Sequence, residues 1–242
     1  MELWNGFEKE EFTFEGKRAI LVFPRKADKN RNWLLKTEYW DAFPAREIDL
    51  VSRGFHLAYI QNETRFATRA DCDRKARFAD FLIQKYNLSE KCVPVGLSCG
   101  GAHAVNFAGF YPEKIACLYI DAPVLNFLSY PGKIGHAECE RVWENEFVKA
   151  YPNITRAGLL SFDNHPLGKI NVLKEHDIPI LMVYGTEDKT VDYNENGYLL
   201  ELDYKDNPLL KVIKRPYQGH HPHGEVKDVN EIIDFIIKTC EK

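Results

Sequence analysis

Two kinds of apolar spacing alternate along this chain, one typical of buried strands and one typical of amphipathic helices. Continuous apolar runs of strand length alternate with segments whose apolar residues recur every three or four positions, as in amphipathic helices. Strands are predicted over residues 19–23, 55–60, 91–95, 115–120, 178–184 and 209–213, and helices over 45–53, 72–86, 101–110 and 226–237. Residues 7–14, followed by the turn Glu15-Gly16, predict a hairpin that leads into the first buried strand. This alternation favours an α/β fold with a mostly parallel sheet, helices on both faces, and ligands at the carboxyl ends of the strands.

The segment 126–177 interrupts this regular alternation. It contains a Pro/Gly stretch at 130–133, a predicted helix near 138–150 and a polar loop at 161–166. Its large apolar residues, which need a surface to cover, are Phe127, Leu128, Trp143, Phe147, Leu159, Leu160 and Phe162. Long excursions of this kind in compact domains are usually functional. We therefore predict one domain over 1–242 with a small helical lid at 126–177, and we expect Trp143 to contact substrate.

Composition narrows the classes of partner. The 242 residues, 45% of them hydrophobic, suit one α/β domain, and the net charge of −4 comes from interspersed acidic and basic residues. Nucleic acid and membrane are therefore not expected partners, and the early acidic residues do not resemble a secretory signal, which predicts a cytoplasmic protein. The scattered cysteines, Cys72, Cys92, Cys99, Cys117, Cys139 and Cys240, contain no CxxC pair. They predict free thiols rather than disulfides or a zinc site, and the composition leaves the oligomeric state open.

The most specific local motif is Gly96-Leu97-Ser98-Cys99-Gly100, between a predicted strand and a predicted helix. In that context GxSxG is a nucleophile elbow, in which small residues allow a sharp turn that lifts the serine hydroxyl clear of the sheet. The motif alone recurs by chance as a glycine-rich turn, and its position between strand and helix favours the catalytic interpretation. Ser98 is the predicted nucleophile.

A serine hydroxyl needs a neighbouring base, and the base needs a group that orients it. Asp188, in the loop after the strand 178–184, is the predicted acid, with Glu187 and Asp121 as competitors. His220 follows Gly219 after the last strand and is the predicted base. His221 and His223 stand beside it, and we interpret them as hydrogen-bonded residues of the loop. A metal site is the less favoured alternative, because no carboxylate or cysteine ligand stands beside the histidines at a defined spacing.

The order Ser98, Asp188, His220 is the chain order of α/β-hydrolase triads. The chain resembles the α/β-hydrolase superfamily over nearly its whole length, in particular bacterial esterase-like members related to the prolyl oligopeptidase and dienelactone hydrolase groups. Segments similar to Gly219–His223 and Tyr119–Pro123 occur in such hydrolases. This sequence departs from them in two ways. Pro24-Arg25-Lys26 replaces the usual His-Gly segment after the first buried strand, and the nucleophile is serine where dienelactone hydrolases have cysteine.

An oxyanion hole requires two backbone N–H donors. We predict that Cys99 supplies one and that Lys26, or else Arg25, supplies the other from the loop after the first buried strand. Trp33, Lys36, Tyr39 and Trp40 follow in what is interpreted as the same loop, where Trp33 and Lys36 are candidates for substrate contact and the aromatic rings are candidates for stacking on a sugar or aryl group. Packing of the aromatic rings in the core is the favoured alternative.

These residues predict a serine esterase that forms an acyl-enzyme and needs no cofactor. The substrate expected from the resemblance and the aromatic loop is a small acyl ester, for example an acetyl or aryl ester of a carbohydrate. A small peptidase of the prolyl oligopeptidase type and a non-catalytic ligand-binding hydrolase fold are the alternatives.

Overall fold

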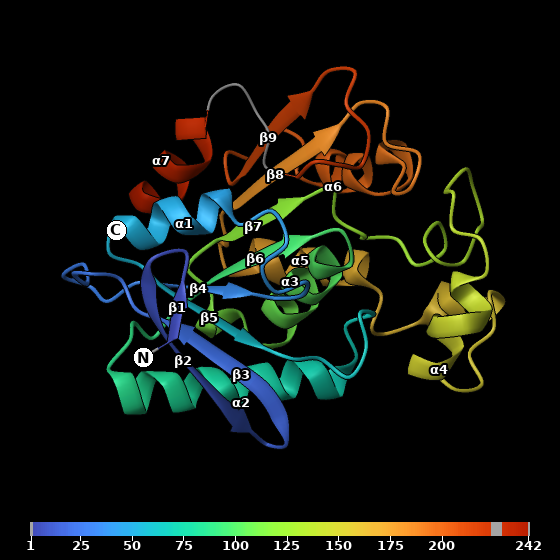
Figure 1. Cartoon of the computed structure of the whole chain (residues 1–242). Helices are drawn as coiled ribbons and strands as arrows, with labels where there is room; N and C mark the ends of the chain where they lie inside the picture. The colour runs from blue at the N-terminus through green and yellow to red at the C-terminus, as the bar shows by residue number, and fades with distance from the viewer. Residues whose placement is uncertain (1, 224–228, 242) are drawn as a thin grey trace.

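A twisted sheet forms the centre of the protein, as the computed structural model in Figure 1 shows for residues 2–223 and 229–241. The nine strands of this described part follow the spatial order β1-β2-β3-β5-β4-β6-β7-β8-β9. Strands β1 to β3 pair antiparallel, β3 also runs antiparallel to β5, and β4 to β9 are parallel. The strands are β1 (Glu2–Trp4), β2 (Phe7–Phe14), β3 (Lys17–Val22), β4 (Trp33–Lys36), β5 (His56–Ile60), β6 (Val93–Leu97), β7 (Leu118–Asp121), β8 (Ile180–Gly185) and β9 (Leu210–Arg215).

Helices cover both faces of the sheet, as the sequence predicts. On one face α1 (Ala45–Ser52) and α7 (Val229–Cys240) share a core with the inward side chains of the strands. The other face packs against α2 (Arg69–Tyr86), α3 (Cys99–Phe110), α5 (Ile170–Glu175) and α6 (Gly197–Asp203). Both cores consist mainly of aliphatic and aromatic residues with almost no exposed surface. Burial of this apolar surface is the main favourable contribution to folding.

Element boundaries differ from the sequence prediction where a cap or a pairing partner decides them. Helix α2 begins at Arg69, earlier than predicted, because the Thr68 side chain accepts a hydrogen bond from Asp71 N and caps the helix. The predicted helix 138–150 is instead the π-helical turn Trp143–Phe147, followed by α4 (Val148–Ala150). The predicted start of the last helix lies outside the described residues, and α7 is described from Val229.

Strand β4 is the element that the sequence prediction missed. Its four residues are all buried because the strand lies between β5 and β6 in the middle of the sheet. Trp33 is 1% exposed, and its indole N–H donates to Ser89 O at 2.8 Å. The ammonium of Lys36 pairs with the buried Glu47 carboxylate. The prediction that Trp33 and Lys36 contact substrate is therefore wrong, because both side chains lie inside the protein.

Replacing Glu47 by Ala is expected to lower the free energy of unfolding by about 3–5 kcal/mol, because Lys36 would then be a buried charge without its partner. The change is measured by urea denaturation. Asp49→Ala on the same helix is the control, since it breaks an exposed pair with Arg53 at 2.9 Å and should cost less than about 1 kcal/mol. Equal losses for the two variants would contradict the energetic role given to the buried pair.

The segment 126–177 packs most of its large apolar residues against the protein body near the carboxyl end of β6, and Leu160 stays exposed. Phe127, Phe147 and Leu159 belong to a buried cluster with Phe66 and Cys99.

Among the residues described, no helix is both long enough and apolar enough to cross a bilayer.

Candidate active site

Ser98 lies on the sharp turn between β6 and α3. Its backbone has φ 54° and ψ −120°, a conformation that L-residues rarely adopt. Glycines surround it because the turn leaves no room for side chains. A Cβ at Gly96 would lie 2.4 Å from Gly100 O, and one at Gly101 would lie 2.3 Å from Pro123 Cβ. The strained turn holds the Ser98 side chain at the carboxyl edge of the parallel strands, as the GxSxG motif predicts.

The loops after β8 and β9 bring Asp188 and His220 to the same edge. The Ser98 hydroxyl lies 2.9 Å from His220 Nε2, and His220 Nδ1 lies 2.7 Å from Asp188 Oδ2. The other Asp188 oxygen accepts hydrogen bonds from the backbone N–H groups of Thr190 and Val191, both at 2.9 Å. Asp188 therefore has a fixed orientation and accepts a hydrogen bond from the Nδ1–H of His220. This arrangement leaves the lone pair of Nε2 directed at the hydroxyl proton of Ser98.

The competing acids and histidines occupy other positions. The Glu187 backbone N–H donates to Gln218 O at 2.9 Å, and the side chain is exposed. Asp121 pairs with His223 rather than with His220, at 3.0 Å. The ring of His221 stacks on Phe43 with centroids 5.5 Å apart, and partial desolvation of this ring, together with the neighbouring imidazoles of His220 and His223, lowers the pKa of His221.

The three imidazoles of His220, His221 and His223 each place one nitrogen within 4.8 Å of the others, a grouping that could hold a metal ion. Both nitrogens of His220, however, are engaged by Ser98 and Asp188. A metal ion bound to His220 would therefore have to displace its hydrogen bond with Ser98 or the one with Asp188.

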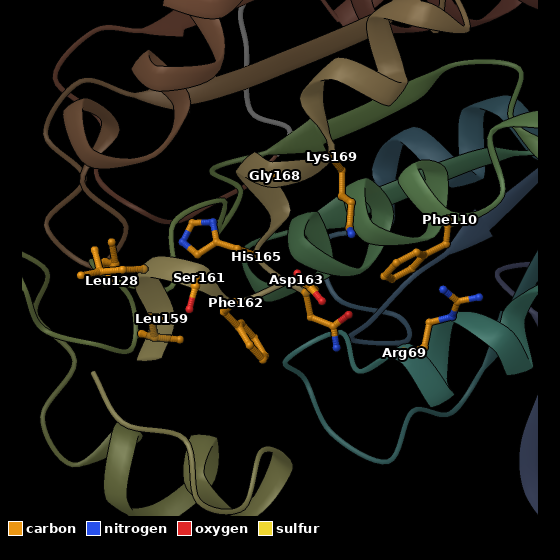
Figure 2. Close-up of a pocket in the computed structure, with 12 residues that line it drawn as sticks. Arg69, Phe110, Leu128, Leu159, Ser161, Phe162, Asp163, His165, Gly168 and Lys169 are labelled. Carbon is orange, nitrogen blue, oxygen red and sulfur yellow. The ribbon is translucent and has the colours of Figure 1, made fainter. Parts of the chain in front are cut away.

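A cavity of about 340 Å³ opens onto Ser98. Its lining residues are Tyr39, Ala42, Phe43, Arg65, Leu97, Ser98, Tyr130, Thr190, His220, His221 and His223. A larger cavity of about 820 Å³ lies between α2, α3 and the segment 159–169 (Figure 2). It shares no lining residue with the cavity at Ser98. We place the candidate site at the smaller cavity because both Ser98 and His220 line it.

The predicted oxyanion donors Arg25 and Lys26 lie at the wrong edge of the sheet. They follow β3, which runs antiparallel to β5 and therefore ends at the amino edge of the parallel strands. Lys26 O is next to Gly54, which precedes β5, and the guanidinium of Arg25 lies over the Phe7 ring at 5.8 Å. The prediction for both residues is wrong because β3 runs opposite to the parallel strands, so the loop after it lies at the far edge of the sheet from Ser98.

The turn after β4 occupies the position that Arg25 and Lys26 were expected to fill. Thr37 Oγ1 lies 2.7 Å from Gly100 O, which holds this turn against the start of α3. Tyr39 follows with a φ of 54° and lines the Ser98 cavity. Cys99 is the first residue of α3 and directly follows Ser98. The Thr37-Glu38 turn thus lies beside Gly100 at the start of α3, and the four-residue run Trp33–Lys36 before it is too short to show a strand period.

Trp143 does not line the Ser98 cavity. Its ring stacks on Phe147 with centroids 5.0 Å apart, and Arg156 lies 4.7 Å over its face. The prediction that Trp143 contacts substrate is therefore not supported by its position. Tyr130 is the residue of segment 126–177 that reaches the cavity.

An ion pair joins segment 126–177 to the rim of this cavity. The guanidinium of Arg65, which lines the cavity, binds both Glu146 oxygens, at 2.6 and 2.7 Å. Arg65 precedes α2 in the chain, so this contact ties the insertion to the body of the domain beside Ser98.

No protein-family model and no curated protein sequence matches this chain. Its structure is similar to that of Est1E from Butyrivibrio proteoclasticus, with a TM-score of 0.68, 14% identity, and coverage of 97% of this chain and 99% of that one. It is also similar to an acylaminoacyl peptidase from Pyrococcus horikoshii, with a TM-score of 0.66, 15% identity, and coverage of 88% and 37%. A puromycin hydrolase gives a TM-score of 0.66 at 16% identity, with coverage of 89% and 36%.

This chain thus spans little more than a third of the acylaminoacyl peptidase and of the puromycin hydrolase, and nearly all of Est1E. At these identities the similarity establishes the fold. The chain has the α/β-hydrolase fold, as the sequence analysis predicts.

Proposed function

We propose that this chain of α/β-hydrolase fold is a serine carboxylic-ester hydrolase, with Ser98 as nucleophile, His220 as general base and Asp188 as the orienting acid. The observation that carries the proposal is the continuous hydrogen-bonded series from Ser98 Oγ to His220 Nε2 and from His220 Nδ1 to Asp188. Three side chains from the ends of three different strands meet in the order that nucleophilic acyl transfer requires.

In the first half of the reaction, Ser98 Oγ attacks the ester carbonyl carbon while its proton passes to His220 Nε2. Asp188 stabilises the imidazolium that forms. The protonated His220 then gives this proton to the departing alcohol oxygen, which leaves an acyl group on Ser98. In the second half, water repeats the sequence and releases the acid. We assign the oxyanion contacts to the backbone N–H of Cys99 and to the Glu38-Tyr39 turn.

The size and lining of the cavity support a small ester as substrate. Its volume of about 340 Å³ lies at the small end of the range for ligand pockets. The rings of Tyr39, Phe43 and Tyr130 line it, and such aromatic surfaces suit the faces of a sugar or an aryl group. We therefore keep an acetyl or aryl ester of a carbohydrate as the proposed substrate class.

A fluorophosphonate probe tests this proposal against its alternatives. An active serine hydrolase should become labelled at Ser98, and prior heating of the protein should abolish the labelling. Folded protein that remains unlabelled would favour a ligand-binding protein instead. Turnover of peptide amides in preference to matched esters would favour the peptidase alternative.

Tyr130→Ala should change the selectivity among esters of different size, because Tyr130 is the contribution of segment 126–177 to the cavity. The kcat/KM ratio between a short and a longer acyl ester is expected to shift by about tenfold. Leu160→Ala is the control, since Leu160 lies in the same segment, is 78% exposed, and does not line this cavity. A uniform loss for all esters in Tyr130→Ala would indicate a folding defect, and an unchanged ratio would contradict a role for this segment in selectivity.

A further inference from the structure

Asp121, Arg215 and His223 form a group of buried polar side chains beside Ser98, His220 and Asp188. This group has no role in the mechanism above. His223 Nδ1 is 3.0 Å from Asp121 Oδ1, and Arg215 Nη2 is 3.3 Å from the same oxygen. Arg215 also donates to the carbonyl oxygen of Pro222, next to His223. Asp121 and His223 come from the two segments on which the resemblance to hydrolases rests, and the fold brings them into contact.

This group is costly to bury. Asp121 is fully buried, and Arg215 and His223 are 2% and 5% exposed. Removing such charges from water costs several kcal/mol for each ion, and apolar residues of similar volume usually serve stability as well or better. A contribution to stability therefore explains poorly why these three residues are buried together. Their effect on the His223 ring offers a better explanation.

The effect on His223 is to fix which ring nitrogen carries the proton. A carboxylate only accepts hydrogen bonds, so the contact with Asp121 places the proton on Nδ1. Arg215 Nη2 lies 3.3 Å from the same carboxylate oxygen, which ties Asp121 to a second side chain. With its proton on Nδ1, the imidazole of His223 has Nε2 as a hydrogen-bond acceptor, and the contact on the other nitrogen orients the ring.

The position of His223 indicates which part of a substrate it would meet. His223 lines the Ser98 cavity, and the ring of Phe43 packs edge-on against it at 5.3 Å. In acyl transfer the base returns its proton to the oxygen of the leaving alcohol, so that oxygen lies beside His220. His223 lies beside His220 on the wall of the same cavity, so it is next to the alcohol part of the ester. An acceptor at this place matches a hydroxyl on the carbon that adjoins the ester oxygen.

We propose that His223, oriented by Asp121 and Arg215, is a substrate-binding residue that accepts a hydrogen bond from a free hydroxyl vicinal to the scissile ester. The preferred substrates are then monoesters of vicinal diols, as in partly acylated sugars and polyols. This inference rests on the proposed esterase function and specifies the alcohol side of its substrate.

Two matched esters test it. Ethylene glycol monoacetate has a free hydroxyl beside the ester, and the same compound with that hydroxyl methylated has none. The wild type should prefer the ester with the free hydroxyl by about tenfold or more in kcat/KM. This ratio reflects one hydrogen bond to His223 that the free hydroxyl forms, whereas the methylated ester leaves the buried acceptor without a partner. The side chain in His223→Asn keeps an N–H donor for Asp121 and lacks Nε2, so this preference should fall to near unity. p-Nitrophenyl acetate, which has no vicinal hydroxyl, reports whether the folded variant still hydrolyses esters, and the loss of preference between the two glycol esters is expected whatever that basal rate is.

His221→Asn is the matched control, because His221 is exposed and has no carboxylate partner among the residues described. It should retain the wild-type preference. Equal kcat/KM of the wild type for the two glycol esters would overturn the inference without any variant, which covers the case that His223→Asn fails to fold. An intact preference in folded His223→Asn would also overturn it. Absence of p-nitrophenyl acetate turnover by the wild type would instead overturn the proposed function.

Discussion

Replacing Ser98 by Ala is expected to lower kcat for ester hydrolysis by about 10⁴-fold or more while leaving the melting temperature nearly unchanged. The variant removes Oγ, the proposed nucleophilic atom, which lies 2.9 Å from His220 Nε2. Stability should be preserved because the strained backbone at φ 54° is set by the turn and its glycines. The measurement is steady-state hydrolysis of p-nitrophenyl acetate, together with thermal unfolding.

A control for this experiment is Ser52→Ala, which removes a hydroxyl that donates to Asp49 O on the surface of α1. It should leave turnover unchanged. If Ser98→Ala retained turnover close to that of the wild type, the acyl-enzyme mechanism would have to be abandoned. If the variant unfolded, labelling by the fluorophosphonate probe at Ser98 in the wild type would still decide the identity of the nucleophile.

Replacing His220 by Ala should cause the second large loss, about 10³- to 10⁴-fold in kcat, because Ser98 would lose its base and the leaving alcohol its acid. His220 is the histidine that contacts both Ser98 and Asp188. His221→Ala, in the adjacent position, should cost little, because this ring stacks on Phe43 at the mouth of the cavity. Each variant is assayed at a fixed pH with the same ester.

The histidine series also tests the assignment of the base. A loss of about 10²-fold or more toward p-nitrophenyl acetate in His223→Ala, combined with a mild effect of His220→Ala, would make His223 the base and Asp121 its acid. The present geometry is against this outcome, since His223 is bonded to Asp121 and Ser98 is bonded to His220.

Most of the fold was predictable because its strands and helices have strong local patterns. The run 178–184 and the stretch 72–86 each contain enough apolar residues at one period to specify an element. Strand β4 was not predictable in the same way, because four residues between two polar stretches are too short to show a period. Its place between β5 and β6 comes from pairing with residues distant in the sequence. Missing it misplaced Trp33, Lys36, Arg25 and Lys26 together.

By itself the sequence determined the α/β-hydrolase fold and the proximity of Ser98, Asp188 and His220. Glycine spacing and strand ends are local properties, and the carboxyl ends of parallel strands necessarily meet at one edge. Only the tertiary structure decided which charged and aromatic side chains surround these residues. The antiparallel direction of β3 takes Arg25 away from the site, and pairing across the sheet brings Asp121 to His223. Such contacts join residues far apart in the chain, and their energies depend on burial and direction, which no local pattern encodes.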